Sequence, residues 1–243
     1  MPTDIRVACF QRREICGDPD TVVAAILKDV AWAEDNGADL CLFPESFLQG
    51  YPHSRADVHA SALRLTDSPI ETLLTRLGPY QPTVVVGFIE ASGTAFYNSA
   101  LVMRAGECLG VSRKRHPNEA GICPGEDTPL FNIGKTSFGI SICNDANYPE
   151  TLNRMAKGGA DIILAPLNNM LPIATADTWR HKTPQILQMR AQETGCWVAS
   201  ADVIGTHDGY KSYGCTAIVS PDGDIIEKAP EGVPGAIIHT LAL

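Results

Sequence analysis

The chain has 243 residues, of which 44% are hydrophobic, and a formal net charge of −9 at pH 7. Nucleic acids and anionic membranes both reward basic patches, so this charge argues against either as a partner. No apolar run approaches the roughly 18 residues that a membrane span needs, and the N-terminus lacks the basic start and apolar core of a signal peptide. We therefore expect a cytoplasmic protein with a sizeable apolar core.

Eight cysteines are scattered along the sequence, with no C-x-x-C pair and no histidines at the spacing of metal ligands. We expect reduced thiols and no bound metal. The sequence has no phosphate-binding loop and no dinucleotide fingerprint, so we expect no cofactor either. A free cysteine is more often a packed apolar side chain than a chemical group, so a reactive one has to be identified from its neighbours.

The first half of the chain predicts alternating strands and helices. Asp18 and Pro19 form a helix start, with the aspartate as cap and the proline as first helical residue, and Gly37 ends this helix. One face of the helix is apolar: Val23, Ile26, Leu27 and Val30. The other expected elements are strands over 5–10, 39–43 and 83–89, a helix over 69–78 and a hairpin over 98–112.

The second half repeats this order, and two of its segments match the first half residue by residue. Residues 36–46 match 158–168, and residues 97–110 match 213–226. The expected elements are strands over 138–143, 161–166 and 197–203, a helix over 149–157, a long helix ending near Gly195 and a hairpin over 215–228. These patterns predict an α/β fold, a four-layer α-β-β-α sandwich with internal pseudo-twofold duplication, as one domain over 1–243.

The two halves differ where a strand ends. Pro44-Glu45 follows one strand, and Leu167-Asn168 follows its counterpart. A carboxylate buried without a partner is costly and usually responds with a raised pKa, which is also how a general base is made. Glu45 is therefore a candidate base, with an ordinary surface glutamate as the alternative.

Glu45, Lys114 and Cys143 each lie where a predicted strand ends or a loop begins, and loops at strand ends usually carry catalytic groups. With FPES, the RK-x-H segment, the C-x-D-x-x-x-P-E segment and RAQETGCWV in order, the sequence resembles the nitrilase superfamily of carbon–nitrogen hydrolases. The resemblance covers nearly the whole chain. It implies a Glu–Lys–Cys triad and a hydrolase that cleaves a non-peptide C–N bond of a small amide and releases ammonia or an amine.

The resemblance also implies a role for each member of the triad. Cys143 is the nucleophile that forms a thioester, Glu45 takes its proton, and Lys114 supplies positive charge. A free thiol has a pKa of about 8.5 and attacks only as thiolate, so it needs such neighbours. Lys114 and the backbone N–H of Asn144 could stabilise the tetrahedral oxyanion.

Several neighbouring residues are auxiliary candidates. Many relatives carry a second glutamate after the lysine, which Glu119 matches, with Glu126 as a rival. His116 lines the pocket or, as we prefer, supports the loop by a hydrogen bond. Asn168 and Asn169 face the pocket or are ordinary turn residues.

Other local signals predict structural roles. We expect Asp145 to fix its turn by hydrogen bonds, and Pro149 and Glu150 to form the first turn of a helix. Arg190 and Glu193 are expected to form a salt bridge. SPDG, at 220–223, is expected to be a hairpin turn.

The substrate stays open between an amide, an N-carbamoyl amine and a nitrile. The C-N-D motif is similar to that of N-carbamoyl-D-amino-acid hydrolases, which follow it with arginines, whereas this chain has Ala146 and Asn147. Arg55 and Arg180 are substitutes for the missing cation. We expect a preference for uncharged amides, and expect residues 46–68 to shape the pocket.

Two other functions remain as alternatives. The first is a catalytically silent protein that binds small molecules, which the presence of all three triad residues disfavours. The second is an acyltransferase, although membrane-bound acyltransferases of the family carry transmembrane segments. The resemblance further suggests a homodimer or a larger homo-oligomer.

Overall fold

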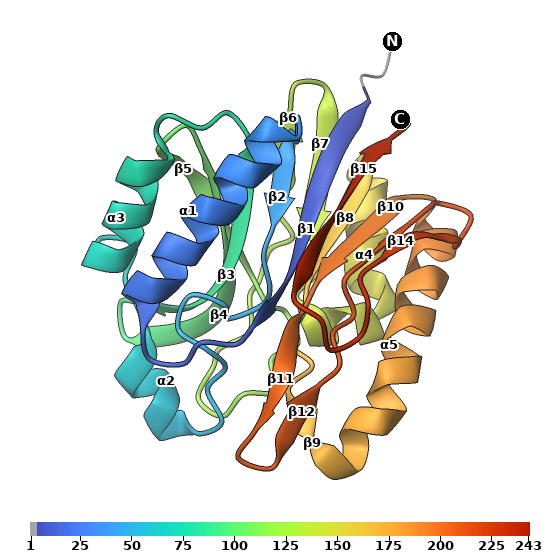
Figure 1. Ribbon diagram of the computed structural model, residues 1–243. Coiled ribbons are helices and arrows are strands. Elements are labelled where there is room, and N and C mark those ends of the chain that lie inside the picture. Colours follow the sequence, from blue (N-terminus) through green and yellow to red (C-terminus); the bar gives the residue numbers. More distant parts are fainter. Residues whose placement is uncertain (1–3) are drawn as a thin grey trace.

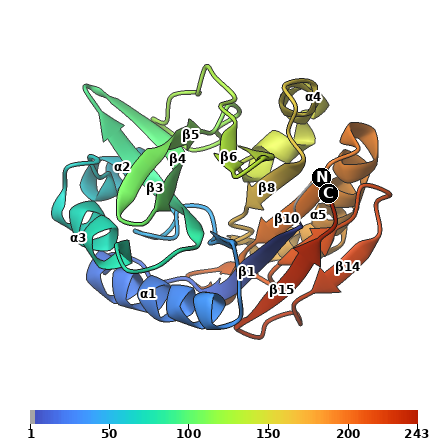
Figure 2. The same ribbon diagram turned by 90° about the horizontal axis from the view of Figure 1, so that it is seen from above.

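Two β-sheets packed face to face form the centre of the computed structural model, which describes residues 4–243 (Figures 1 and 2). The first sheet has the strand order β5-β4-β3-β2-β1-β11-β12-β9, and β15 also pairs with β1. Its strands are β1 (Ile5–Arg13), β2 (Leu40–Leu42), β3 (Thr83–Ser92), β4 (Ala95–Arg104), β5 (Glu107–Arg113), β9 (Leu171–Pro172), β11 (Val203–His207), β12 (Tyr210–Ser212) and β15 (Gly235–Leu241).

The second sheet has the order β14-β13-β10-β8-β7-β6. Its strands are β6 (Phe131–Ile133), β7 (Thr136–Ile140), β8 (Ile162–Pro166), β10 (Trp197–Ala201), β13 (Ala217–Val219) and β14 (Ile225–Lys228). The helices are α1 (Pro19–Asp35), α2 (Arg55–Ser61), α3 (Ser68–Leu77), α4 (Pro149–Lys157), α5 (Ile173–Thr194) and the 3₁₀ turn η1 (Cys143–Asn147). Within residues 4–243, no helix is long and apolar enough to cross a membrane.

Three apolar cores separate four layers. The central core lies between the sheets, where Leu42 of the first sheet and Leu164 of the second are fully buried. Helices α1 and α3 cover the outer face of the first sheet through residues such as Ile26. Helices α4 and α5 cover the outer face of the second sheet through residues such as Leu187 (Figure 2). The predicted α-β-β-α sandwich is confirmed.

The internal duplication is visible in the strand order. Strands β1-β2-β3-β4-β5 and strands β7-β8-β10-β13-β14 follow the same pattern, three parallel strands and then an antiparallel hairpin. Asp39 accepts a hydrogen bond from the Arg6 N–H at 2.8 Å, and Asp161 accepts the equivalent bond from the Ser137 N–H at 2.8 Å. The predicted pseudo-twofold relation therefore extends to individual hydrogen bonds.

The first helix forms as its sequence predicts. The Asp18 carboxylate accepts a hydrogen bond from the Thr21 N–H, which satisfies one of the free donors of the first turn. Pro19 is the first helical residue, and Gly37 adopts φ +72° just beyond the end, in the left-handed region that glycine tolerates. The apolar face is buried against the first sheet: Val23, Ile26, Leu27 and Val30.

The expected strand over 197–203 needs correction. Strand β10 ends at Ala201, and β11 begins at Val203 as part of the other sheet. Between them the N–H of the buried Asp202 donates to the Thr216 hydroxyl at 2.9 Å. Where the chain crosses between the sheets, a side chain and not a neighbouring strand thus satisfies this backbone donor.

Three further differences concern the start of the cysteine turn, helix α2 and strand β15. Strand β7 ends at Ile140, so Cys143 starts the turn η1 and not the end of the expected strand over 138–143. Helix α2 lies inside the segment 46–68, which the sequence analysis left without structure. Strand β15 was not predicted, and it covers the edge of β1 that would otherwise lie open over Ile5–Gln11.

Candidate active site

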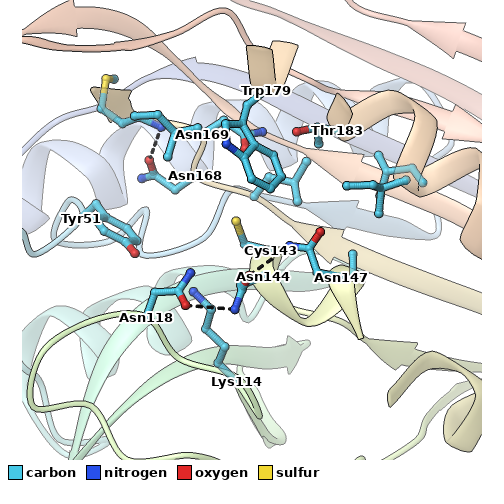
Figure 3. A pocket seen from close by; sticks show the side chains of 16 residues that line it. Tyr51, Lys114, Asn118, Cys143, Asn144, Asn147, Asn168, Asn169, Trp179 and Thr183 are labelled. Carbon is cyan, nitrogen blue, oxygen red and sulfur yellow. Dashed lines mark hydrogen bonds between the residues drawn. The ribbon is translucent and has the colours of Figure 1, made fainter. Parts of the chain in front are cut away.

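Three segments converge at one end of the sheets. Glu45 lies just after β2, Lys114 follows β5 directly, and Cys143 starts η1 after β7. The Lys114 Nζ is 2.6 Å from Glu45 Oε1, and both side chains are fully buried. Lys114 and Cys143 line the same pocket (Figure 3). The structure thus brings together all three residues that the sequence analysis singled out.

The backbone is strained at Cys143 and at the residue that follows Glu45. Ser46, next to Glu45, has φ +51°, and Cys143 has φ +44°, values that a residue with a side chain rarely adopts. Each such residue costs on the order of 1–3 kcal/mol, and this strain is often found at functional sites. The Glu45 N–H is held by the carbonyl of Leu167 in the other half of the molecule, at 3.1 Å.

Asp145 fixes the turn of the cysteine, as expected. Its carboxylate accepts hydrogen bonds from the backbone N–H groups of Ile142, Arg115 and His116, at 3.1, 3.1 and 2.8 Å. Two of these donors belong to the loop that follows Lys114. The buried carboxylate therefore ties the cysteine turn to the lysine loop, and burial raises its pKa.

Glu119, and not its rival Glu126, is in contact with the lysine. The Lys114 Nζ is 2.8 Å from Glu119 Oε1, whereas Glu126 is exposed. Asn98 joins the group: its Nδ2 donates to Glu45 Oε1 at 2.8 Å and to Glu119 Oε1 at 2.7 Å. The sequence analysis missed Asn98. A signal was present, because the matching position in the second half is a glycine.

Burial and charge act in opposite directions on the lysine and its two carboxylates. Burial alone would lower the pKa of Lys114, but Glu45 and Glu119 hold it well above its ordinary value. Burial raises the pKa of Glu45 to about 7, against the opposing effect of Lys114. Burial also acts to raise the pKa of Glu119, but Lys114 outweighs it and the pKa is lowered. Glu119 thus stays ionised while Glu45 is poised to exchange a proton near neutral pH.

Cys143 is a protonated thiol at rest. Burial raises its pKa well above the ordinary value, and the nearby Glu45 raises it further. Lys114 and a hydrogen bond from the Asn168 backbone N–H oppose this shift but do not cancel it. The thiol therefore needs a base to become a nucleophile, and Glu45 Oε2 has no hydrogen-bond partner among the described residues.

The pocket above the cysteine is small and mostly apolar, with a volume of about 120 Å³. Helix α5 contributes Trp179 and Thr183, which are labelled in Figure 3, and also Ile186 and Leu187. Lys114 is its only charged lining residue within the described chain. The remaining lining residues are Tyr51, Asn118, Cys143, Asn144, Ala146, Asn147, Leu167, Asn168, Asn169, Met170 and Leu171. The sequence analysis did not identify Tyr51 or Asn118 as lining residues.

Asn168 and Asn169 line the pocket, and each of them donates a hydrogen bond to a carboxylate that does not line it. The Asn168 Nδ2 donates to Glu14 Oε1 at 2.8 Å. Asn169 donates to the buried Asp202 twice, from its N–H at 3.0 Å and from its Nδ2 at 2.7 Å. Burial raises the pKa of Asp202 to about 6. The two supporting carboxylates were not predicted, because nothing in the sequence links them to these asparagines.

His116 supports the loop and does not line the pocket. Its ring stacks on Tyr148 with a centroid distance of 3.7 Å, and its Nε2 is 3.2 Å from the Thr151 hydroxyl. Asn144 does line the pocket, and its Nδ2 donates to the His116 carbonyl at 2.8 Å and to Asn118 Oδ1 at 3.1 Å. Of the two roles considered for His116, the structure shows the supporting contacts.

The two arginines considered as substitute cations lie elsewhere. Arg180 pairs with Glu231 at 3.1 Å, and Arg55 packs beside Gly121. Neither lines the pocket that holds Cys143.

The remaining structural expectations are confirmed. Arg190 and Glu193 form an ion pair at 2.9 Å. Pro149 and Glu150 start helix α4, and residues 220–223 form the turn between β13 and β14.

Comparison with known proteins gives a consistent result. The family model described as carbon–nitrogen hydrolase matches residues 6–243. A nitrilase from Pyrococcus abyssi is 28% identical over 242 residues, which is 93% of this chain and 86% of that protein. A glutamine-dependent NAD(+) synthetase from Thermotoga maritima is 28% identical over 233 residues, or 91% of this chain, but the match spans only 39% of the synthetase.

One solved structure is similar over nearly its full length. It is a mutant of an amidase from Nesterenkonia sp. AN1, with a TM-score of 0.85 and 25% identity, and the match covers 98% of this chain and 90% of the amidase. In that amidase, the acetamide moiety of fluoroacetamide is added covalently at the active-site cysteine.

Gly87 controls the position of the Glu45 segment. A Cβ at Gly87 would lie 2.5 Å from the Ser46 nitrogen and 2.6 Å from the Glu45 Cα. We expect Gly87→Ala to lower the free energy of unfolding by about 1–3 kcal/mol, because the overpacked backbone must shift. Urea unfolding measures this, with Gly235→Ala as the control, since nothing lies within 4 Å of a Cβ there. Equal stabilities of the two variants would contradict the close packing.

Proposed function

The chain belongs to the carbon–nitrogen hydrolase family, and from this membership we propose that it hydrolyses a small uncharged amide through a thioester on Cys143. The proposal depends on one observation above all: a thiol and a buried ammonium line one small pocket, and a carboxylate whose pKa is raised to about 7 lies 2.6 Å from that ammonium. None of these groups can catalyse amide hydrolysis by itself. Together they supply a nucleophile, a base and a site for negative charge.

The first half of the reaction forms the thioester. Glu45 Oε2 takes the thiol proton of Cys143 as the sulfur attacks the amide carbonyl carbon. The carbonyl oxygen becomes an oxyanion, which the Lys114 ammonium and the Asn144 backbone N–H stabilise. Glu45 then passes the proton to the nitrogen, the C–N bond breaks, and ammonia or an amine leaves. The acyl group stays on sulfur as a thioester.

The second half returns the enzyme to its resting state. Glu45, ionised again, takes a proton from a water molecule as the water oxygen attacks the thioester carbonyl. The same two donors stabilise the second oxyanion. The C–S bond breaks, the carboxylic acid leaves, and Cys143 recovers its proton from Glu45. One water is consumed for each amide.

The hydrogen bonds around Glu45 indicate which of its two oxygens takes up and releases the proton. Its Oε1 accepts from both Lys114 and Asn98, so it is fixed and saturated. Its Oε2 is left without a partner among the described residues. Glu119 completes the arrangement, because a second carboxylate keeps Lys114 charged and oriented when Glu45 is protonated.

The size and charge of the pocket support a small neutral substrate. An apolar cavity of roughly 150 Å³ can hold a benzene molecule, and this pocket has about 120 Å³. Its single lining cation, Lys114, is already paired with Glu45 and Glu119. A substrate carboxylate would be buried without a partner, which costs several kcal/mol.

Cys143→Ala is expected to abolish turnover and leave the fold intact, because a single small thiol contributes little packing. Ammonia release from small amides and thermal unfolding measure the two effects. Cys123→Ala is a matched control, since Cys123 is also half-buried. Mass spectrometry of the wild type with a slow substrate should find the acyl group on Cys143, and an adduct on another cysteine would contradict the assignment.

Glu45→Gln is expected to reduce kcat by roughly 10²–10⁴, because the amide cannot accept a proton. Lys114→Arg should also lower kcat strongly, since the planar guanidinium cannot replace a compact ammonium between two carboxylates. The wild-type kcat/KM should fall as the pH drops below about 7, where Glu45 becomes protonated. Glu126→Gln and Lys135→Arg are controls at exposed positions. Near-normal rates in either test variant would disprove the triad.

A neutral amide should be hydrolysed with a kcat/KM at least about a hundredfold higher than an N-carbamoyl amino acid of similar size, given a burial cost of several kcal/mol. Butyramide and N-carbamoylglycine are suitable probes. Asn147→Arg places a cation at a lining position and should narrow the difference, whereas Asn132→Arg, on β6 away from the pocket, should not. A wild-type preference for the carbamoyl compound would overturn this selectivity.

A further inference from the structure

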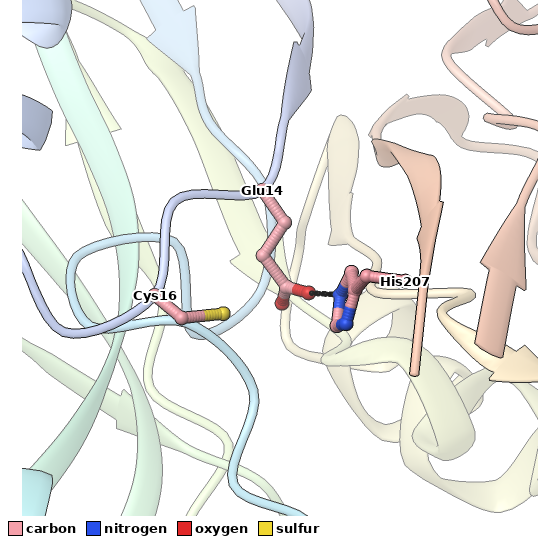
Figure 4. Close-up of side chains that lie close together, drawn as sticks. All are labelled: Glu14, Cys16 and His207. Carbon is pink, nitrogen blue, oxygen red and sulfur yellow. Dashed lines mark hydrogen bonds and ion pairs between the residues drawn. The ribbon is translucent and has the colours of Figure 1, made fainter. Parts of the chain in front are cut away.

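A second group of reactive side chains lies outside the pocket of the candidate active site, and Glu14 is one of its members. Glu14 and Cys16 belong to the segment between β1 and α1, and His207 ends β11 (Figure 4). One ligand atom from each of the three residues lies within 4.8 Å of the other two. The proposed hydrolysis uses none of these atoms.

The carboxylate of Glu14 is held in a fixed orientation. Its Oε1 accepts hydrogen bonds from the Tyr51 N–H at 2.9 Å and from the Asn168 Nδ2 at 2.8 Å. Its Oε2 is 3.0 Å from His207 Nε2, and the carboxylate side chain is only 2% exposed. One backbone donor and one side-chain donor therefore hold the carboxylate so that its second oxygen points at the histidine.

The position of the Cys16 sulfur is also determined by its neighbours. The sulfur lies over Gly50, where a Cβ would be only 2.8 Å from it. The N–H of Gly17 donates to the Gln49 carbonyl at 3.0 Å, which ties the two segments together. All three residues line a cavity that is open to solvent at their side and also borders Tyr51.

We infer that Glu14 Oε2, Cys16 Sγ and His207 Nε2 bind a thiophilic divalent cation, with Zn²⁺ as the best match. One imidazole nitrogen, one sulfur and one carboxylate oxygen are the ligand types that Zn²⁺ takes in tetrahedral sites. Water from the cavity supplies the fourth position. The sequence analysis expected no metal, because the two segments are far apart in the chain and only the fold brings them together.

Binding exchanges a proton for the metal ion. Without a cation, burial and the carboxylates of Glu14 and Asp208 raise the pKa of Cys16 to about 11, so it is a thiol at neutral pH. The cation replaces the sulfur-bound proton, which leaves to solvent. It also replaces the hydrogen bond between Glu14 and His207, and the neutral imidazole then carries its proton on Nδ1, which is 3.5 Å from Asp208 Oδ2, so that Nε2 is free to bind. No oxidation or reduction takes place.

The cation would act as a clamp at the rim of the pocket. It joins the segment after β1, whose Glu14 is hydrogen-bonded to the pocket-lining Asn168, to the β11–β12 hairpin, which pairs with the pocket-lining Leu171 of β9. Glu14 keeps its Oε1 on Tyr51 and Asn168, two pocket-lining residues. The site thereby links metal occupancy to the pocket wall while standing independently of the thioester chemistry.

The test is a titration of metal-free protein in a Cys143→Ala background, which removes the proposed nucleophile as a competing thiol. Isothermal titration with Zn²⁺ should find one ion per chain with a Kd in the micromolar range or below. Co²⁺ should give a sulfur-to-metal charge-transfer band. Cys16→Ser should abolish that band, and both Cys16→Ser and His207→Ala should weaken Zn²⁺ binding at least about a hundredfold.

Cys108→Ser and His181→Ala are matched controls, because both positions are exposed and lie outside the cluster and the cavity beside it. Both should keep the wild-type affinity and the charge-transfer band. Equal melting temperatures of the metal-free variants would show that all of them fold. The inference is overturned if binding is not saturable, if it survives in Cys16→Ser and His207→Ala, or if it is lost in Cys108→Ser.

Discussion

The Lys114 ammonium, buried between two carboxylates, is the interaction on which the rest of the site depends. A buried charge is tolerated only when it is paired and hydrogen-bonded, and Lys114 reaches Glu45 at 2.6 Å and Glu119 at 2.8 Å. One cation cannot neutralise two carboxylates, so their environments separate them: the pKa of Glu119 is lowered, and that of Glu45 is raised to about 7. The lysine thus creates both an ionised partner and a carboxyl group that can exchange a proton.

Much of this arrangement follows from physical rules that are legible in the sequence. The capped start and apolar face of α1 could be predicted because they depend on neighbouring residues alone. The duplication directed attention to strand ends where the halves differ, and this identified Glu45. The same comparison would have identified Asn98, which stands where the second half has Gly214. Local patterns and internal repetition were enough for the layers and for Glu45, whereas Lys114 and Cys143 were assigned to the site through the resemblance to a known family.

The remaining features depend on contacts between distant segments. Glu14 supports Asn168 from a position 154 residues away, and Asp202 supports Asn169 from 33 residues away. Neither pair has a sequence pattern of its own. At the crossing from β10 to β11 the Asp202 N–H donates to the Thr216 hydroxyl, a contact that a run of apolar residues does not reveal. Hydrogen-bond partners of this kind are set by the fold, so they could be found only in the structure.

These supporting carboxylates also bear on substrate charge. Glu14 and Asp202 stand directly behind the pocket wall, and Glu45 and Glu119 stand beneath it, whereas Lys114 is the only cation that lines it within residues 4–243. Fixed negative charge in a poorly solvated region repels an anion more strongly than it would in water. The asparagine amides cannot turn to compensate, because their Nδ2 groups already donate to the carboxylates behind them. The pocket therefore disfavours an anionic substrate twice, by the missing cation and by the surrounding charge, and a neutral amide avoids both costs.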